Sequence, residues 1–100
     1  MAFVYILYSS ALNKYYTGSC KDIYDRVHQH LYKVFPRAFT GKAKDWILYF
    51  LIENLGYKQA RLIERHIKRM KSKIYIENLK KYPEISQKLI RKYDLKESCN

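Results

Sequence analysis

Residues 2–18 of the chain read AFVYILYSSALNKYYTG, and this stretch determines how the rest of the chain is interpreted. The residues from 2 to 8 are mostly β-branched, aromatic or aliphatic, which predicts a strand. Residues 9–13 are turn-like, and residues 14–18 predict a second strand. The stretch is therefore predicted to form a β-hairpin.

Beyond the hairpin, hydrophobic periodicity predicts four helices and one further strand. They are helices over 22–33, 58–71, 74–81 and 83–93, and an apolar strand over 46–53 that is the central or third strand of the sheet. Residues 34–45 lack periodicity and predict a basic loop. The order β-β-α-β-α-α-α with helices on a small sheet indicates the α+β class. At this length one domain is expected, over residues 1–94, followed by a frayed polar tail over 95–100.

The chain is strongly basic. It has 20 Lys and Arg against 9 Asp and Glu, a formal net charge of +11, and 48% of its residues are hydrophobic. Such an excess opposes compaction and predicts an acidic partner, nucleic acid first and an anionic membrane surface second. A lysine-rich genome composition is the alternative explanation. Residues 32–48 carry a net +3 and residues 49–81 a net +6, a local concentration that favours phosphate binding.

Other features of the sequence exclude several classes of protein. No apolar stretch is long enough to span a bilayer, and no secretory leader is recognised, so a cytoplasmic protein without membrane association is expected. Two cysteines cannot build a disulfide framework. The spacing of Cys20, His28 and His30 matches no Cys/His zinc pattern. Phosphate loops, dinucleotide-binding glycine motifs and serine nucleophile motifs are absent from the sequence.

Arg26 and His30 are a possible pair in the helix predicted over 22–33. They are four residues apart, so they point the same way from the edge of the apolar stripe. A helix edge that faces a sheet edge is where a cleft forms. In the alternative interpretation Arg26 pairs with Asp22 at the surface and His30 is solvated.

Glu64 is the carboxylate of the helix predicted over 58–71, whose apolar positions are Ala60, Ile63, Ile67 and Met70. It lies close to this stripe, yet most of its charged neighbours in sequence are basic. A carboxylate weakens phosphate binding unless it holds a cation. The alternative is an ion pair with Lys68, four residues further on.

Tyr5 and Tyr16 lie on the two strands of the predicted hairpin. Alternation of side chains along a strand allows both to occupy one face of the sheet. A single strand tyrosine usually serves packing, so their joint position is what makes them candidates.

These elements together resemble the GIY-YIG endonuclease superfamily, specifically its small stand-alone bacterial members related to the nuclease module of the excision-repair endonuclease. The first family tripeptide corresponds to Phe3-Val4-Tyr5 and the second to Tyr16-Thr17-Gly18, with the family's spacing between them. The family's remaining positions fall on Arg26, His30, Glu64 and Asn78. The resemblance covers residues 2–81, and the departures are Phe3, Val4 and Thr17 within the tripeptides.

The resemblance implies a three-stranded, mainly antiparallel sheet flanked by helices, and metal-dependent hydrolysis of DNA phosphodiester bonds. Glu64 would hold Mg²⁺ or Mn²⁺, and Arg26 would clamp the phosphate. Tyr5 or Tyr16 would deprotonate water, which requires nearby cations because the pKa of a free tyrosine is near 10. His30 would orient a tyrosine or relay a proton, and Asn78 would complete the site.

The basic loop and the glutamate helix would contact DNA, which is expected to be double-stranded or branched. The contact residues expected are Arg37, Lys42, Lys44, Arg61, Arg65, Lys68, Lys71 and Lys73. An inactive DNA- or RNA-binding module is the alternative, and a nuclease that needs a protein partner for specificity is a third possibility.

Overall fold

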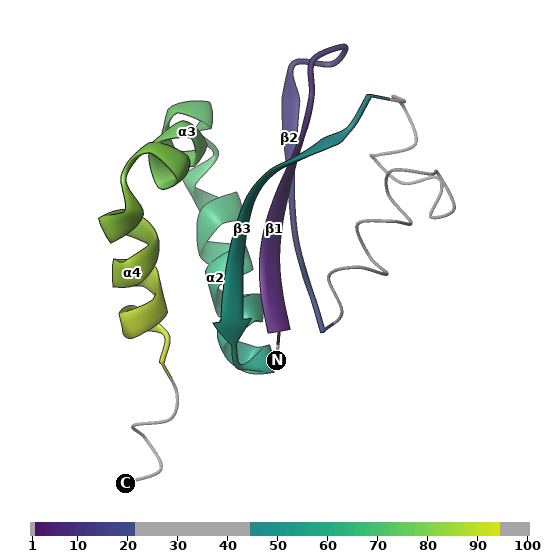
Figure 1. Cartoon of the computed structure of the whole chain (residues 1–100). Coiled ribbons are helices and arrows are strands. Elements are labelled where there is room, and N and C mark those ends of the chain that lie inside the picture. Colours follow the sequence, from purple (N-terminus) through teal and green to yellow (C-terminus); the bar gives the residue numbers. More distant parts are fainter. Residues whose placement is uncertain (1, 22–44, 95–100) are drawn as a thin grey trace, which may run out of the picture.

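The computed structural model describes residues 2–21 and 45–94. In chain order these residues form β1 (Ala2–Ser9), β2 (Lys14–Cys20), β3 (Ile47–Leu55), α2 (Tyr57–Met70), α3 (Lys73–Lys81) and α4 (Pro83–Lys92). The strands form one antiparallel sheet in the order β2-β1-β3, and the three helices follow (Figure 1). The predicted α+β class and the antiparallel three-stranded sheet are confirmed. The predicted helix 22–33 and most of the predicted loop 34–45 lie outside the described residues, as does the tail 95–100.

The predicted β1–β2 hairpin is present, and in its antiparallel register Tyr5 pairs with Gly18 and Leu7 with Tyr16. The turn passes through Asn13, whose φ of 52° is the left-handed conformation that asparagine tolerates. The Tyr8 hydroxyl donates to Asn13 Oδ1 at 3.1 Å and holds this turn.

Asp45 ties the hairpin turn to the segment that precedes β3. Its Oδ1 accepts from the buried Ser9 hydroxyl at 2.6 Å, and its Oδ2 accepts from Ser10 Oγ and from the Ala11 amide, both at 2.8 Å. These donors favour the ionised carboxylate, so they lower the pKa of Asp45 from 3.8 to about 2, with the Ser9 hydroxyl as the largest cause.

Asp45 is therefore expected to make folding more sensitive to acid. Because its folded pKa is depressed, its stabilising contribution is present above about pH 4 and is lost as the pH falls to about 2. Urea midpoints measured between pH 2 and 6 should show a smaller acid loss in Asp45→Asn than in wild type. The control is Glu53→Gln, which alters an exposed carboxylate of β3 and should keep the wild-type profile. Equal acid losses in Asp45→Asn and wild type would contradict this role.

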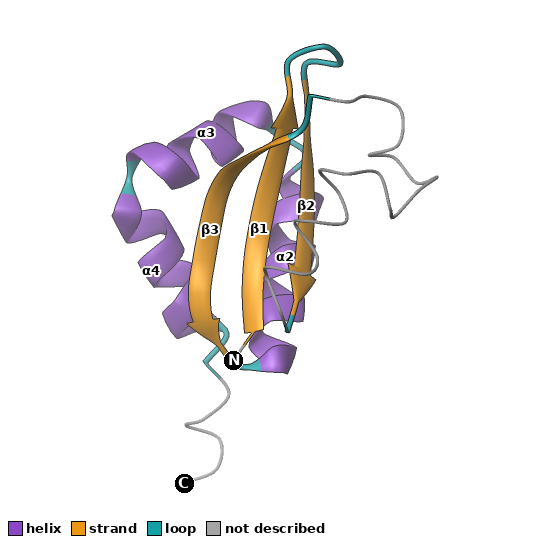
Figure 2. Ribbon diagram, turned by 45° about the vertical axis from the view of Figure 1, so that its right-hand side comes forward, coloured by secondary structure: helices purple, strands orange, loops and turns teal. Residues whose placement is uncertain are grey.

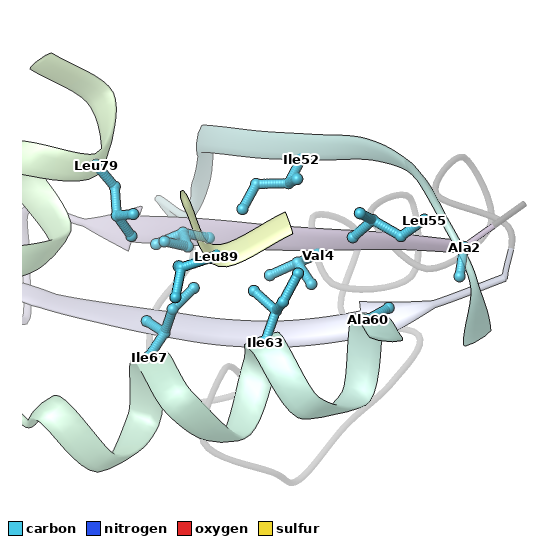
Figure 3. Packing of buried hydrophobic residues seen from close by; sticks show 10 residues of the cluster. Ala2, Val4, Ile52, Leu55, Ala60, Ile63, Ile67, Leu79 and Leu89 are labelled. Atoms are coloured by element: carbon cyan, nitrogen blue, oxygen red, sulfur yellow. The ribbon is translucent and has the colours of Figure 1, made fainter. Parts of the chain in front are cut away.

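The two faces of the sheet have separate cores. On one face, side chains of β1 and β3 pack against α2, α3 and α4 (Figure 3). The members of this core are Ala2, Val4, Ile6, Ile52, Leu55, Ala60, Ile63, Ile67, Leu79 and Leu89. On the other face Tyr5, Leu7 and Trp46 form a second cluster, with Tyr16 packed against it. The three helices thus cover one face of the sheet (Figure 2). The motif tyrosines occupy the opposite face.

Two details of the predicted elements are corrected by the structure. Met70 does not belong to the buried stripe of α2: it is 45% exposed, because it ends the helix where the chain turns away through Lys71 at φ 49°. The apolar run from residue 46 is the third strand and not the central one. As β3 it pairs with β1 alone among the described strands, and its first residue, Ile47, is 57% exposed.

Helix α4 and the residue that follows it are anchored to α2 by partly buried polar contacts. The Gln59 side chain joins the two, since its Nε2 donates to the Ile90 carbonyl at 2.9 Å while its Oε1 accepts from the Gly56 amide at 3.0 Å. His66 Nδ1 lies 2.9 Å from the Tyr93 hydroxyl. Burial lowers the pKa of His66, and the charges of Lys92 and Arg69 lower it further.

No helix among the described residues is long and apolar enough to cross a membrane.

Candidate functional site

The two motif tyrosines lie together on the face of the sheet that α2 does not cover. The ring centroids of Tyr5 and Tyr16 are 6.5 Å apart with planes 28° apart, and Trp46 meets the Tyr16 ring edge-on at 6.5 Å. Tyr5 is 2% exposed, whereas Tyr16 on the edge strand β2 is half-buried. The predicted joint position of the two tyrosines on one face is confirmed.

Gly18 gives the buried Tyr5 ring its space. A Cβ atom placed on Gly18 would lie 2.5 Å from Tyr5 Oη and 2.6 Å from Tyr5 Cζ, closer than packed atoms tolerate. Both residues sit at paired positions of the hairpin, so neither backbone can move away without breaking the ladder. The last residue of the second tripeptide is therefore a glycine because the tyrosine of the first lies against it.

Gly18→Ala is expected to destabilise the fold by about 1–3 kcal/mol, the usual cost of overpacking, and to displace the Tyr5 hydroxyl. The comparison is Gly56→Ala, where the added Cβ meets nothing closer than 3.9 Å and should cost less than about 1 kcal/mol. Urea denaturation of both variants measures the difference. Equal free energies of unfolding for the two would show that the Tyr5 ring is free to yield.

Tyr15, the neighbour of Tyr16, faces the other way and belongs to the helix-covered side. Its ring packs edge-on against Tyr49 at 5.1 Å, and its hydroxyl donates to Glu77 Oε2 of α3 at 3.4 Å. Burial raises the pKa of Tyr15, and hydrogen bonding to Tyr49 and the charge of Glu77 add to the increase. Tyr15 therefore packs on the helix-covered side of the sheet, whereas Tyr16 lies on the face that carries Tyr5.

Glu64 projects from α2 toward the same edge strand. Its Oε1 accepts from the Ser19 hydroxyl of β2 at 2.5 Å, and its Oε2 accepts from Lys68 Nζ at 2.7 Å. The side chain of Glu64 is 20% exposed, so the carboxylate is held between strand and helix with one side open to solvent. The ion pair with Lys68, foreseen from the i, i+4 spacing, is present in the structure.

Sequence reasoning missed Ser19. Side chains alternate between the two faces of a strand, and this alternation could have indicated its position. Residue 19 is an odd number of positions from Tyr16, so its side chain lies on the opposite face of β2, where α2 packs. The hydrogen bond to Glu64 joins residues 45 positions apart in the chain, and no local pattern predicts that contact.

Lys68 links the tyrosine side and the carboxylate side of the site. Its ammonium pairs with Glu64 and also lies 5.9 Å from the centroid of the Tyr16 ring. Because β2 is an edge strand, a long side chain from α2 can reach past it to both faces. Tyr16 and Lys68 also line a shallow pocket of about 400 Å³ together with Lys71 and Ser72. The site thus wraps around the edge of β2 that no other described strand pairs with.

The exposed side of α2 is basic around Glu64. The helix carries five basic residues and a single acid, and Arg61, Glu64, Arg65 and Lys68 line one small hollow of about 200 Å³. Arg61 Nη1 donates to the Tyr57 hydroxyl at 3.3 Å, which raises the pKa of Arg61 above its usual value. Lys71 and Lys73 follow as exposed residues. The described residues of the expected DNA-contact set therefore all lie between positions 61 and 73, on α2 and at the start of α3.

The remaining expected residues are not brought to this edge by the described structure. Arg26, His30, Arg37, Lys42 and Lys44 lie outside the described residues. Asn78 is on α3, where its carbonyl accepts from the Tyr82 amide at 2.7 Å. Helix α3 packs on the helix-covered side of the sheet, opposite the face that carries the motif tyrosines.

The oxygen donors at the edge fit a hard divalent cation with few protein ligands. Glu64 offers a carboxylate, and Ser19 offers a hydroxyl beside it. Among the described residues no group of three or more His, Cys, Asp or Glu is arranged to hold a metal. A lone carboxylate suits Mg²⁺, which keeps several waters and takes further oxygen ligands from a substrate phosphate. It does not suit a metal that requires a complete protein cage.

Fold and site together define a small α+β domain in which a tyrosine pair, a carboxylate and a basic helix meet at one sheet edge. Comparison with protein families matches residues 1–82 to the GIY-YIG catalytic domain, so the chain belongs to the GIY-YIG family. Membership implies nuclease-type hydrolysis of phosphodiester bonds in nucleic acid, in a family that generally uses a divalent metal. No curated protein and no solved structure shows significant similarity to the chain. Helix α4 lies beyond the matched residues.

Proposed function

We propose that the protein is a metal-dependent DNA endonuclease that hydrolyses phosphodiester bonds at the β2 edge. The observation that carries this proposal is the position of Lys68, whose ammonium contacts Glu64 and lies 5.9 Å from the centroid of the Tyr16 ring. A tyrosine, a carboxylate and a cation at one open edge are the groups that water activation and phosphate binding require.

Each described residue would have a definite task. Glu64 would hold Mg²⁺ or Mn²⁺, with the Ser19 hydrogen bond fixing its orientation; the bound metal supplies Lewis-acid stabilisation of charge on the phosphate. Tyr16 would accept the proton of the attacking water. Arg61, Arg65, Lys71 and Lys73 would bind flanking phosphates, and their charge would make binding weaken with salt.

Tyr16 is the preferred base because it is half-buried at the edge, next to Lys68, whereas Tyr5 is 2% exposed beneath Gly18. Tyr5 would position the Tyr16 ring through their contact. From outside the described residues, Arg26 would clamp the scissile phosphate and His30 would orient a tyrosine or relay the proton. Asn78 remains a proposed site residue on the sequence resemblance.

The substrate proposed is double-stranded or branched DNA, and the setting proposed is DNA repair in the cytoplasm. These statements rest on the resemblance to the nuclease module of the excision-repair endonuclease and on the net charge of +11. A protein partner that supplies specificity is compatible with a chain of this size.

An inactive nucleic-acid-binding module is the second candidate function. The observation that favours it is the ion pair itself, because Lys68 occupies one oxygen of the carboxylate that would hold the metal. Such a module would bind DNA or structured RNA in a salt-sensitive way and would not cleave it.

Incubation with supercoiled plasmid and with branched duplexes, in Mg²⁺, Mn²⁺ or EDTA, separates the two candidates. The nuclease should nick DNA only with metal, and EDTA should stop the reaction. Binding that falls with salt while every DNA stays intact under all metal conditions would favour the inactive module.

A further inference from the structure

We propose, on the basis of the proposed function, that Lys68 is a tethered counter-ion that DNA must draw away before Glu64 can take the metal. In free protein the ammonium would hold the carboxylate and repel a divalent cation. A DNA phosphate at the β2 edge would attract Lys68, so DNA and metal would bind with positive coupling. Lys68 would therefore be a positioning residue that acts through Glu64.

Both carboxylate oxygens of Glu64 have hydrogen-bond partners. Oε1 accepts from Ser19 of β2, while Oε2 accepts from Lys68 at 2.7 Å. The exposed fraction is 52% for the Lys68 side chain and 20% for the Glu64 side chain. Glu64 lines two hollows, one with Arg61, Arg65 and Lys68, and one of about 410 Å³ with Ser19 and Tyr57. A cation that enters the first hollow competes with the Lys68 ammonium directly.

The charges around the carboxylate oppose metal binding in the absence of DNA. Arg61, Arg65 and Lys68 line the same hollow as Glu64, so a lone dication there would face three cations and one carboxylate. Coulomb repulsion of this kind acts over the separations found within one hollow and is screened only in part by salt. Bound phosphates would neutralise these cations, and the same hollow would then accept a metal.

The Lys68 side chain also lies beside a second pocket, next to Tyr16. Its amine already lies 5.9 Å from the Tyr16 ring centroid, and Lys68 lines the neighbouring pocket with Lys71. A lysine ammonium on a flexible four-carbon stem can follow a phosphate into such a pocket at little cost. An exposed i, i+4 ion pair is weak, so a phosphate contact can replace it. The movement would leave Glu64 bound to Ser19 alone and open toward solvent.

The test is Mn²⁺ affinity, read from the electron paramagnetic resonance signal of free Mn²⁺ at constant ionic strength. Four proteins are compared: wild type, Lys68→Met, Lys58→Met and Glu64→Gln. Lys58→Met removes the same charge from the same helix at an exposed position outside the hollow. Glu64→Gln supplies the baseline for Mn²⁺ bound elsewhere on protein or DNA. Circular dichroism checks that each variant folds, and gels check that the duplex is intact during the measurement.

Without DNA, Lys68→Met should bind Mn²⁺ on the order of tenfold more tightly than wild type, because one repelling charge and one competing partner are gone. Lys58→Met should stay within about twofold of wild type, since a distant exposed charge is screened. With duplex DNA, the Glu64-dependent affinity of wild type should rise until it differs from that of Lys68→Met by less than about twofold.

Equal Mn²⁺ affinities of wild type and Lys68→Met without DNA would overturn the counter-ion role. If Glu64-dependent binding and plasmid nicking persisted in that case, the proposed nuclease function would stand and only the role of Lys68 would fall. Absence of Glu64-dependent Mn²⁺ binding in every protein, with and without DNA, would overturn both the counter-ion role and the metal site.

Discussion

Glu64→Gln is expected to reduce the rate of plasmid nicking by at least about 10³-fold while the protein stays folded. Glutamine keeps the length of the side chain and an oxygen that accepts from Ser19, but it removes the charge that a divalent metal requires. The lost ion pair with Lys68 is an exposed i, i+4 pair, so its loss should change the free energy of unfolding by less than about 1 kcal/mol.

The measurement pairs nicking rates in Mg²⁺ and Mn²⁺ with urea denaturation of the same samples. Glu53→Gln is the matched control, because it makes the identical change at an exposed carboxylate of β3. It should nick at the wild-type rate. A Glu64→Gln protein that folds and still nicks within about tenfold of wild type would remove Glu64 from the active site.

Tyr16→Phe is expected to have the next largest effect, a loss of about 10²–10⁴-fold in nicking rate, the range typical of a missing general base. Phenylalanine keeps the ring that packs beside Tyr5 and Trp46, so the protein should remain folded. The loss should appear in the rate of the chemical step, with DNA affinity measured in Ca²⁺ or EDTA nearly unchanged.

Tyr5→Phe is the informative comparison for Tyr16→Phe. Tyr5 is 2% exposed beneath Gly18, so removal of its hydroxyl should slow nicking by less than about tenfold and act through the placement of Tyr16. Single-turnover rates of the two variants decide the assignment. The reverse order of losses would make Tyr5 the base, and equal small losses would show that neither hydroxyl accepts the proton.

Much of the fold follows from local patterns in the chain. Strand composition and the turn-like residues 9–13 predicted the β1–β2 hairpin, and the structure has it over residues 2–20. The i, i+3, i+7 spacing of Ala60, Ile63 and Ile67 predicted the buried stripe of α2. These predictions succeed because burial of one face forces a period on the sequence.

The same reasoning fails where burial depends on distant segments. The apolar run that forms β3 was predicted to be the central or third strand of the sheet, and the structure gives the central position to β1 and an edge to β3. Strand order depends on which segments pair across long loops, and the sequence of an apolar strand does not indicate which strands it pairs with. Met70 follows the helical period but extends past the last turn that contacts the sheet.

The candidate site divides in the same way. The sequence by itself determined the elements that carry Tyr5, Tyr16 and Glu64, and through its resemblance to a family it determined their expected roles. Alternation along the hairpin allowed both tyrosines to share a face, and the register of the hairpin places them there.

Only the tertiary structure decided that α2 lies on the opposite face from the tyrosines, so that the described site residues meet around the β2 edge of the sheet. It also brought Ser19 to Glu64 across 45 residues and set Tyr5 against Gly18. The physical reason is that sequence periodicity records which side chains are buried, whereas the neighbours of each one depend on strand order, register and helix packing between segments far apart in the chain.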